Sequence, residues 1–162
     1  MDADVCLTIR IPSHVSMESA ALLEPLGVAI HAARRASVEQ GDTAVVFGAG
    51  TVGLLTAAMA KMSGATTVLI ADIDHGRVNY ALSNGFATKG YIVSPRKHLG
   101  ETSEKLALAK EVAGDVMKIA SQNEPDFEGA DVTFDCTGKE ICMQAGLYVG
   151  FSRAEYRCEI GS

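Results

Sequence analysis

The sequence is poor in the residues that mark a disulfide scaffold or a fibrous protein. Only 6% of its 162 residues are aromatic and four are cysteine, whereas 48% are hydrophobic and 21% are charged. The cysteine spacings match neither a C-x-x-C pair nor a zinc-finger pattern, so we expect reduced thiols in a cytoplasmic protein. The composition disfavours disordered, fibrous and disulfide-rich classes and predicts one globular domain.

Excess positive charge and an export signal are also missing. Fourteen Lys and Arg oppose twenty Asp and Glu, a net charge of -6, so we expect no nucleic acid and no membrane as partner. Residues 1–12 lack the apolar core of a secretory signal. The stretch 43–60 is 18 residues without a charge, but Gly48, Gly50 and Gly53 interrupt it. That punctuation predicts a buried strand, turn and helix rather than a membrane span.

Strand-like and helix-like segments alternate along most of the chain. Apolar and β-branched runs predict strands at 43–47, 67–71, 91–93 and 132–136. Helical spacing and capping residues predict helices at 17–23, 25–35, 51–63, 77–84, 106–120 and 139–149. This alternation implies parallel pairing through right-handed crossovers. We therefore expect an α/β fold with a Rossmann-type doubly wound parallel sheet in the order 3-2-1-4.

A glycine-rich loop lies between the first predicted strand and the helix that follows it. Its sequence, Gly48-Ala49-Gly50-Thr51-Val52-Gly53, has the G-x-G-x-x-G spacing. In such a loop the first glycine permits the tight turn, the second lets a pyrophosphate approach the backbone, and the third lets helix and strand pack closely. The phosphates would bind the free N–H groups at the helix start. The loop predicts a nucleotide cofactor, the alternative being a purely structural turn.

Asp72 follows the second predicted strand, 19 residues after Gly53. A carboxylate there can accept both adenosine ribose hydroxyls and would repel a 2′-phosphate, which favours NAD over NADP. Arg77 lies close enough in sequence to weaken that repulsion. The alternative role for Asp72 is a helix cap, for which Asp74 is better placed. An S-adenosylmethionine site usually has an acidic residue before the first glycine, where this chain has Phe47.

Several short motifs occur together and point to one family. They are Glu24-Pro25-Leu26-Gly27-Val28, His31-Ala32-Ala33-Arg34-Arg35, the glycine loop, Asp72 with Arg77, and Asp135-Cys136-Thr137-Gly138. Over residues 6–148 the chain resembles the zinc-dependent medium-chain dehydrogenases, especially the sorbitol, xylitol and arabinitol dehydrogenase branch. The resemblance covers the cofactor-binding part of that family, so we expect a chain truncated at both ends.

The resemblance assigns a role to each candidate site residue. It implies that Thr51 and Val52 line the pyrophosphate and nicotinamide side of NAD, and that Asp72 and Arg77 lie on the adenosine side. It places the turn formed by Cys136, Thr137 and Gly138 at the nicotinamide ribose. It also implies that Glu24 faces the zinc through a bound water, whereas the residues alone suggest a helix-entry carboxylate.

The resemblance also predicts what this chain lacks. In the family the zinc ligands lie mostly in a catalytic domain that precedes this part, so we expect no complete catalytic site here. We divide the chain into helices that lead from that absent domain (1–36), an NAD-binding Rossmann domain (37–149) and an aberrant tail (150–162). The tail has no apolar run of strand length. We therefore expect strands five and six to be missing and the fourth strand to be an open edge.

The expected function is that of an NAD- and zinc-dependent oxidoreductase. By resemblance, such an enzyme oxidises a small-molecule polyol or secondary alcohol to a ketose or ketone by hydride transfer, and this chain supplies the cofactor half and is inactive alone. The alternative is a non-catalytic NAD-binding or unstable remnant of such an enzyme. Relatives form homo-oligomers through the sixth strand, so we do not expect that assembly for this chain.

Overall fold

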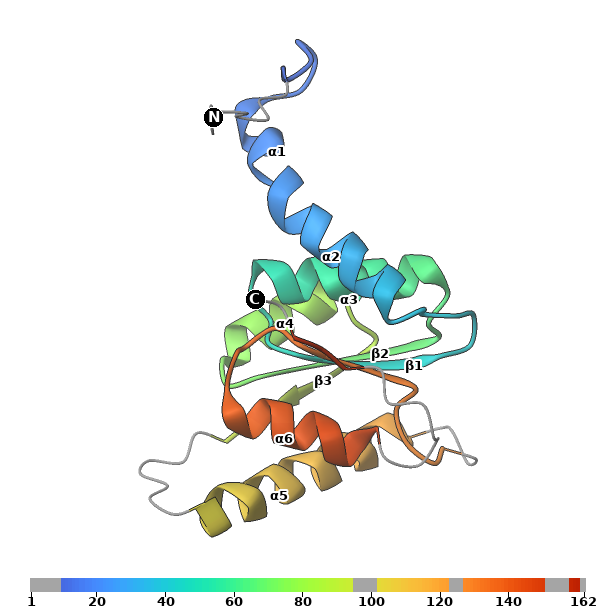
Figure 1. The fold of residues 1–162 in the computed structure, drawn as a ribbon, viewed down its shortest axis with the longest axis vertical. Coiled ribbons are helices and arrows are strands. Elements are labelled where there is room, and N and C mark those ends of the chain that lie inside the picture. The colour runs from blue at the N-terminus through green and yellow to red at the C-terminus, as the bar shows by residue number, and fades with distance from the viewer. Residues whose placement is uncertain (1–9, 95–101, 123–126, 151–157, 161–162) are drawn as a thin grey trace, which may run out of the picture.

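The computed structural model describes residues 10–94, 102–122, 127–150 and, for the backbone alone, 158–160. A parallel sheet in the order β3-β2-β1-β4-β5 forms its centre (Figure 1). Its strands are β1 (Thr43–Phe47), β2 (Thr67–Asp72), β3 (Lys89–Ile92), β4 (Val132–Asp135) and β5 (Cys158–Ile160). The helices are α1 (Met17–Ala21), α2 (Leu23–Arg35), α3 (Thr51–Ser63), α4 (His75–Ser83), α5 (Thr102–Ala120) and α6 (Glu140–Val149).

The predicted order 3-2-1-4 is confirmed, but the prediction that strand five is missing is wrong. Residues Cys158–Ile160 form β5, which pairs in parallel with β4 so that Thr133 aligns with Cys158. The edge of β4 is therefore covered, and the tail is not devoid of strand. Three residues are too few to produce an apolar or alternating pattern. Strand β5 is recognised by its backbone pairing with the edge of β4, and not by the amino-acid composition of the tail. The described residues include no sixth strand.

Two layers of helices cover the sheet, as expected for a doubly wound fold (Figure 1). Side chains alternate along each strand, so Val46 and Ile70 join one core while Val45 and Leu69 join the other. The first core includes Ala57 and Ala60 of α3, and α2 and α4 lie on the same side. The second core lies under α5 and α6. All five residues of β1 are buried, which explains its apolar run from Ala44 to Phe47.

The capping residues that the sequence indicates are found at the helix ends. The Ser16 hydroxyl accepts the N–H of Ser19 at 3.1 Å before α1, and the Asp74 carboxylate accepts the N–H of Arg77 at 3.0 Å in α4. Gly64 ends α3 in the left-handed region, at φ +115°. Because Asp74 caps α4 directly after β2, this helix begins at the carboxyl edge of the sheet.

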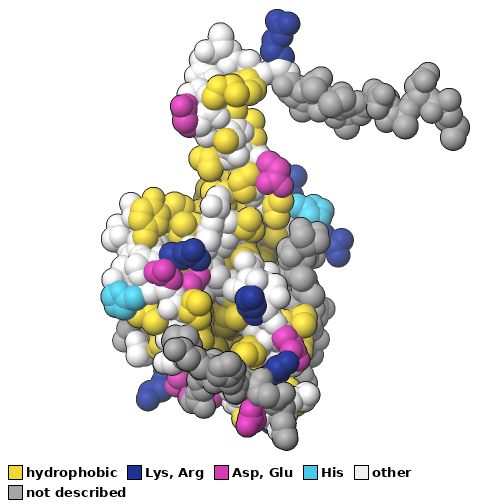
Figure 2. Space-filling view, turned by 90° about the vertical axis from the view of Figure 1, so that its left-hand side faces the viewer, with side chains coloured by type: hydrophobic (Ala, Val, Ile, Leu, Met, Phe, Trp, Pro, Cys, Tyr) yellow, Lys and Arg dark blue, Asp and Glu magenta, His cyan; other side chains and the backbone are white. Residues whose placement is uncertain are grey.

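Helix α1 and the start of α2 project away from the sheet, whereas the rest of α2 packs against α3 (Figure 1). None of the residues of α1 is buried, and in α2 only Ala29 and Ala33 are. Met17 and Leu23 are 73% and 58% exposed, and the space-filling view shows apolar side chains along this projection (Figure 2). In the described part of the chain, none of the helices has the length and apolar character needed to cross a bilayer.

Candidate functional site

The ends of β1, β2 and β4 meet at the carboxyl edge of the sheet. The register aligns Phe47 with Ala71 on one side and with Asp135 on the other. Two hydrogen bonds continue the pairing past the strands: Gly48 N donates to Ala71 O at 2.7 Å and Cys136 N donates to Phe47 O at 2.8 Å. The glycine loop, Asp72 and the Cys136–Gly138 turn, far apart in sequence, are therefore neighbours. In open α/β sheets this edge is where ligands bind.

Two of the three loop glycines are required by the fold. Gly48 has φ +100°, and a Cβ there would lie 3.0 Å from Thr137 Cγ2 and 3.1 Å from Cys136 O. A Cβ on Gly53 would overlap the carbonyl oxygen of Gly48, so α3 could not keep its present distance from β1. These positions give the tight turn and the close helix–strand packing that the motif predicts.

Gly50 is different because the fold does not require a glycine there. Its φ of -78° and ψ of -174° are accessible to any residue, and a Cβ would meet no atom within 4 Å. Gly50 is the N-cap of α3, where no side chain caps the helix and the first turn carries no acidic residue. Exposed Thr51 and half-buried Val52 begin this turn. The loop thus leaves open space beside the positive end of a helix dipole, which fits an anionic pyrophosphate.

Asp72 lies half-buried at the end of β2, beside this loop. Its Oδ2 accepts the N–H of Ala49 at 2.7 Å, and its Oδ1 accepts the N–H of Asp74 at 2.9 Å. The bond to Ala49 was not anticipated from the sequence, because it joins two segments that only the sheet brings together. Arg77 is exposed in the first turn of α4. Asp74, not Asp72, caps α4, so the alternative role for Asp72 is wrong.

The turn after β4 is held by a carboxylate to which the sequence analysis gave no role. Asp135 is 5% exposed, and its Oδ1 accepts the backbone N–H of Thr137 at 2.9 Å and its hydroxyl at 2.6 Å. The Thr137 hydroxyl in turn accepts the N–H of Lys139 at 3.0 Å, and Gly138 has φ +62°. An Asp at the end of a strand is the sequence signal for such a turn, because its side chain can accept the backbone N–H two residues later.

The two cysteines near this turn are neutral thiols. Burial raises the pKa of Cys136 to about 11, and its Sγ lies 3.9 Å from Thr56 Oγ1 of α3. Burial also raises the pKa of Cys142. Since the thiolate is the nucleophilic form, neither residue is suited to covalent chemistry near neutral pH. Cys136 instead fills the space between α3 and the turn.

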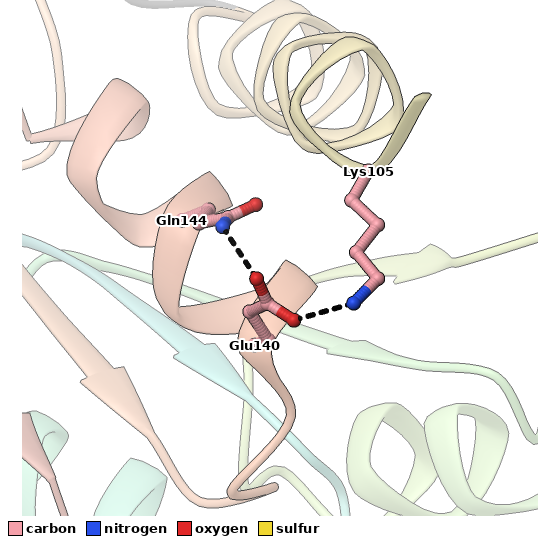
Figure 3. A network of polar contacts seen from close by, with 3 residues as sticks. All are labelled: Lys105, Glu140 and Gln144. Atoms are coloured by element: carbon pink, nitrogen blue, oxygen red, sulfur yellow. Dashed lines mark hydrogen bonds and ion pairs between the residues drawn. The ribbon is translucent and has the colours of Figure 1, made fainter. Parts of the chain in front are cut away.

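A polar network joins α5 to the start of α6 (Figure 3). Lys105 Nζ donates to Glu140 Oε2 at 2.8 Å, and Gln144 Nε2 donates to Glu140 Oε1 at 3.2 Å. The hydrogen bond and charge of Lys105 lower the pKa of Glu140. Gln144 Oε1 is buried and has no hydrogen-bond partner in the described structure. The network adds a polar contact at the edge of the apolar packing between α5 and α6.

The described residues do not provide a zinc site. Glu24 is exposed in the first turn of α2, on the projecting part of the molecule. Among residues 10–94, 102–122 and 127–150, no three His, Cys, Asp or Glu side chains come together as a possible metal site. A catalytic zinc requires about three protein ligands, so the residues described here do not fit one.

Sequence relatives cover nearly all of this domain. The D-xylulose reductase of Scheffersomyces stipitis is 37% identical over 139 residues, which are 86% of this chain and 33% of that protein. A protein of Aspergillus clavatus named "Probable D-xylulose reductase A" is 36% identical over 140 residues, again 86% of this chain and 35% of its own length. The chain thus spans about a third of the length of these relatives. No family model matches it.

Solved structures share the fold. The 2R,3R-butanediol dehydrogenase of Bacillus subtilis is 28% identical, with a TM-score of 0.57 over 95% of this chain and 39% of that one. The zinc dependent alcohol dehydrogenase 2 of Streptococcus pneumonia has a TM-score of 0.66 over 95% of this chain and 41% of its own, at 20% identity, which shows the fold alone. The chain is homologous to part of the zinc-dependent alcohol and polyol dehydrogenases. The resemblance to these dehydrogenases, inferred from the motifs, is confirmed.

Proposed function

We propose that this chain forms the NAD-binding part of a zinc-dependent polyol or secondary-alcohol dehydrogenase. The observation that carries the proposal is Gly50, which lacks a side chain at a position where the fold would accept one. The open space lies at the start of α3, whose N-terminal dipole favours negative charge. A diphosphate is the chemical group that needs both close approach to the backbone and free N–H donors.

The residues proposed to bind the adenosine, Asp72 and Arg77, support a higher affinity for NAD than for NADP. Asp72 places a carboxylate at the end of β2, beside the glycine loop. Such a group accepts hydrogen bonds from ribose hydroxyls and repels a 2′-phosphate. Arg77, exposed in α4, is the cation that would reduce the repulsion. We propose that NAD binds more tightly than NADP and that both use the same loop.

The nicotinamide side is assigned to the turn after β4. Thr137 and Gly138 lie beside the loop, and the bonds to Asp135 fix their backbone. When bound, the nicotinamide supplies the hydride acceptor. The residues of this chain bind and orient it: the glycine loop holds the diphosphate, and Thr137 and Gly138 face its ribose. We propose that in the complete enzyme Glu24 would face a zinc ion that other residues hold.

The substrate class follows from the relatives. Two of them are named as D-xylulose reductases, and a structural neighbour is named as a butanediol dehydrogenase. We propose a polyol or a vicinal diol as substrate of the complete enzyme. We also propose a cytoplasmic location, which the free thiols of Cys136 and Cys142 support.

A thermal melt of the 162-residue chain with NAD and with NADP tests the cofactor assignment. A ligand at 100 times its dissociation constant adds about 2.7 kcal/mol of stability. For a chain of this size that corresponds to a rise of roughly 5–10 °C in Tm. We expect NAD to raise the Tm more than NADP at equal concentration. A Tm that neither nucleotide changes would refute the proposal.

Two substitutions at Gly50 test whether the nucleotide binds at the glycine loop. We expect Gly50→Val to abolish the NAD-dependent rise in Tm, because the branched side chain fills the space left for the diphosphate. The ligand-free Tm should fall by only a few degrees, because a Cβ there meets no atom within 4 Å and the main cost is that valine is a poorer N-cap than glycine. Gly50→Ala is the matched control, with a smaller loss of affinity. Unchanged affinity in Gly50→Val would show that the nucleotide binds elsewhere.

A further inference from the structure

The carboxylate of Asp72 connects two loops before any ligand is present. Its Oδ2 accepts the N–H of Ala49 at 2.7 Å, within the glycine loop that follows β1. Its Oδ1 accepts the N–H of Asp74 at 2.9 Å, in the turn that follows β2. In both bonds the acceptor is an ionised carboxylate. Such charge-assisted hydrogen bonds are stronger than hydrogen bonds between neutral groups.

Ala49 lies in the middle of the turn that joins β1 to α3, between two of the loop glycines. It is 2% exposed and lies between Gly48, which turns at φ +100°, and Gly50, whose carbonyl oxygen accepts the N–H of Leu54 at 2.9 Å and whose Cα faces open space. Gly48 is already tied to Ala71 O at 2.7 Å. The bond from Ala49 to Asp72 extends this anchoring by one residue, up to the glycine that borders the open space.

We propose that Asp72 is a positioning residue that holds the glycine loop in its ligand-binding shape, in addition to recognising the adenosine ribose. The inference rests on the proposed NAD-binding function. Asp72 would then act on both halves of the ADP moiety of the cofactor. It would bind the ribose directly, and it would position the diphosphate-binding loop through its bond to Ala49.

The two roles are chemically compatible. An ionised carboxylate has about four acceptor positions, two on each oxygen. The bonds from Ala49 and Asp74 use one position on each oxygen, so each oxygen can still accept one ribose hydroxyl. The ribose therefore does not have to displace the loop in order to bind.

An amide side chain cannot replace the carboxylate. Asparagine has one acceptor oxygen and one NH2 group, which only donates. Because the two oxygens of Asp72 receive N–H groups from different segments, Asp72→Asn must place its NH2 against the N–H of Ala49 or of Asp74. We therefore expect the isosteric variant to disturb the loop rather than to preserve it.

Comparing the binding of two ligands distinguishes the two proposed roles of Asp72, which are to position the glycine loop and to recognise the ribose. The ligands are NAD and an NAD analogue whose adenosine ribose lacks both hydroxyls, measured by calorimetry with the full 162-residue chain. If Asp72 acts only on the ribose, Asp72→Ala leaves the affinity for the analogue unchanged. If Asp72 also holds the loop, Asp72→Ala and Asp72→Asn weaken the analogue by about tenfold, the loss expected for a hydrogen bond to a charged group. An unchanged affinity for the analogue overturns the inference.

Asp74→Ala is the matched control. It removes the cap bond to Arg77 at 3.0 Å but leaves the backbone N–H of residue 74 and both bonds of Asp72. We expect its affinity for the analogue to stay at the wild-type value. A loss equal to that of Asp72→Ala would assign the effect to α4 rather than to the loop and would overturn the inference.

Amide hydrogen exchange in the ligand-free protein gives an independent readout. We expect the N–H of residue 49 to exchange slowly in the wild type and at least tenfold faster in Asp72→Ala. Fast exchange of this amide in the wild type overturns the positioning role, even where the variants fail to fold. If the wild type binds neither ligand, the proposed cofactor site is refuted, and the exchange rate alone decides whether Asp72 holds the loop.

Discussion

The glycine loop after β1 and the turn after β4 lie side by side but keep their shapes by different means. The first depends on missing side chains, since a Cβ at Gly53 would overlap the carbonyl oxygen of Gly48 and a Cβ at Gly48 would be crowded by Thr137 and Cys136. The second depends on a present one, the buried carboxylate of Asp135, which accepts two bonds from Thr137. A turn that requires glycines can be recognised in the sequence by the spacing of those glycines. A turn that is held by side-chain hydrogen bonds shows only a short polar pattern in the sequence.

The largest expected effect is that of Gly53→Ala on the loop. Its methyl group would overlap the carbonyl oxygen of Gly48, so α3 must move away from β1. We expect a loss of about 3 kcal/mol or more in the free energy of unfolding, the upper range for overpacking a core. Denaturant unfolding of the variant measures it.

Gly50→Ala is the control for that variant, because the same methyl group is added three residues earlier in open space. Alanine is a poorer N-cap than glycine, so a loss of about 1 kcal/mol or less is expected. Equal losses in the two variants would contradict the division of the loop into structural and ligand-facing glycines.

The turn after β4 should be broken by Asp135→Ala. The substitution leaves the N–H and the hydroxyl of Thr137 without their acceptor in a partly buried site. We expect a loss of about 2–3 kcal/mol, since each unsatisfied buried group costs about 1–3 kcal/mol. Thr137→Val keeps the N–H bond to Asp135 and removes the hydroxyl with its bonds to Asp135 and to the exposed N–H of Lys139, so it leaves no buried donor unpaired and should lose less. The reverse order, measured by denaturant unfolding, would show that the carboxylate does not hold the turn.

This contrast explains how much the sequence could predict. Strands β1, β2 and β4 and the loop are encoded locally, by buried β-branched runs and by glycines at fixed spacing, and the strand order follows from the general rules for alternating strands and helices. The bond between Ala49 and Asp72 and the pairing of β5 with β4 are not, because each depends on a neighbour distant in sequence. The short polar pattern around Asp135 was visible, but it carries less information than a glycine motif. The assignments of site residues to parts of NAD remain predictions.

Cys136 links the two regions and should make stability fall at high pH. Burial raises its pKa to about 11 from a reference value of 9.0. Above that reference value the thiol ionises in the unfolded chain but stays neutral in the folded one, so the unfolded state loses its proton first. The stabilising effect is complete below about pH 9 and is lost as pH rises towards 11.

Urea unfolding of the wild type and of Cys136→Ala at pH 8 and at pH 10.5 measures this effect. Other groups titrate in the same interval, so the difference between the two proteins isolates the thiol. We expect the wild type to lose more stability than the variant between the two pH values. Parallel losses would place Cys136 in solvent rather than between α3 and the turn.

The smallest expected effect lies in α6, which continues from the turn. Gln144 donates to Glu140 at 3.2 Å, while its buried Oε1 has no partner among the described residues (Figure 3). Gln144→Met keeps the length of the side chain and removes the unpaired oxygen. Because an unsatisfied buried acceptor costs about 1–3 kcal/mol and an exposed hydrogen bond contributes less, we expect a gain of about 1 kcal/mol. For a chain of this size that is a rise of roughly 2–4 °C in Tm. Gln144→Glu, which keeps the polar group and adds a charge beside Glu140, should lower the Tm instead. If both variants lower it, Oε1 has a partner in the folded protein, and α6 is held by side-chain bonds as the turn before it is.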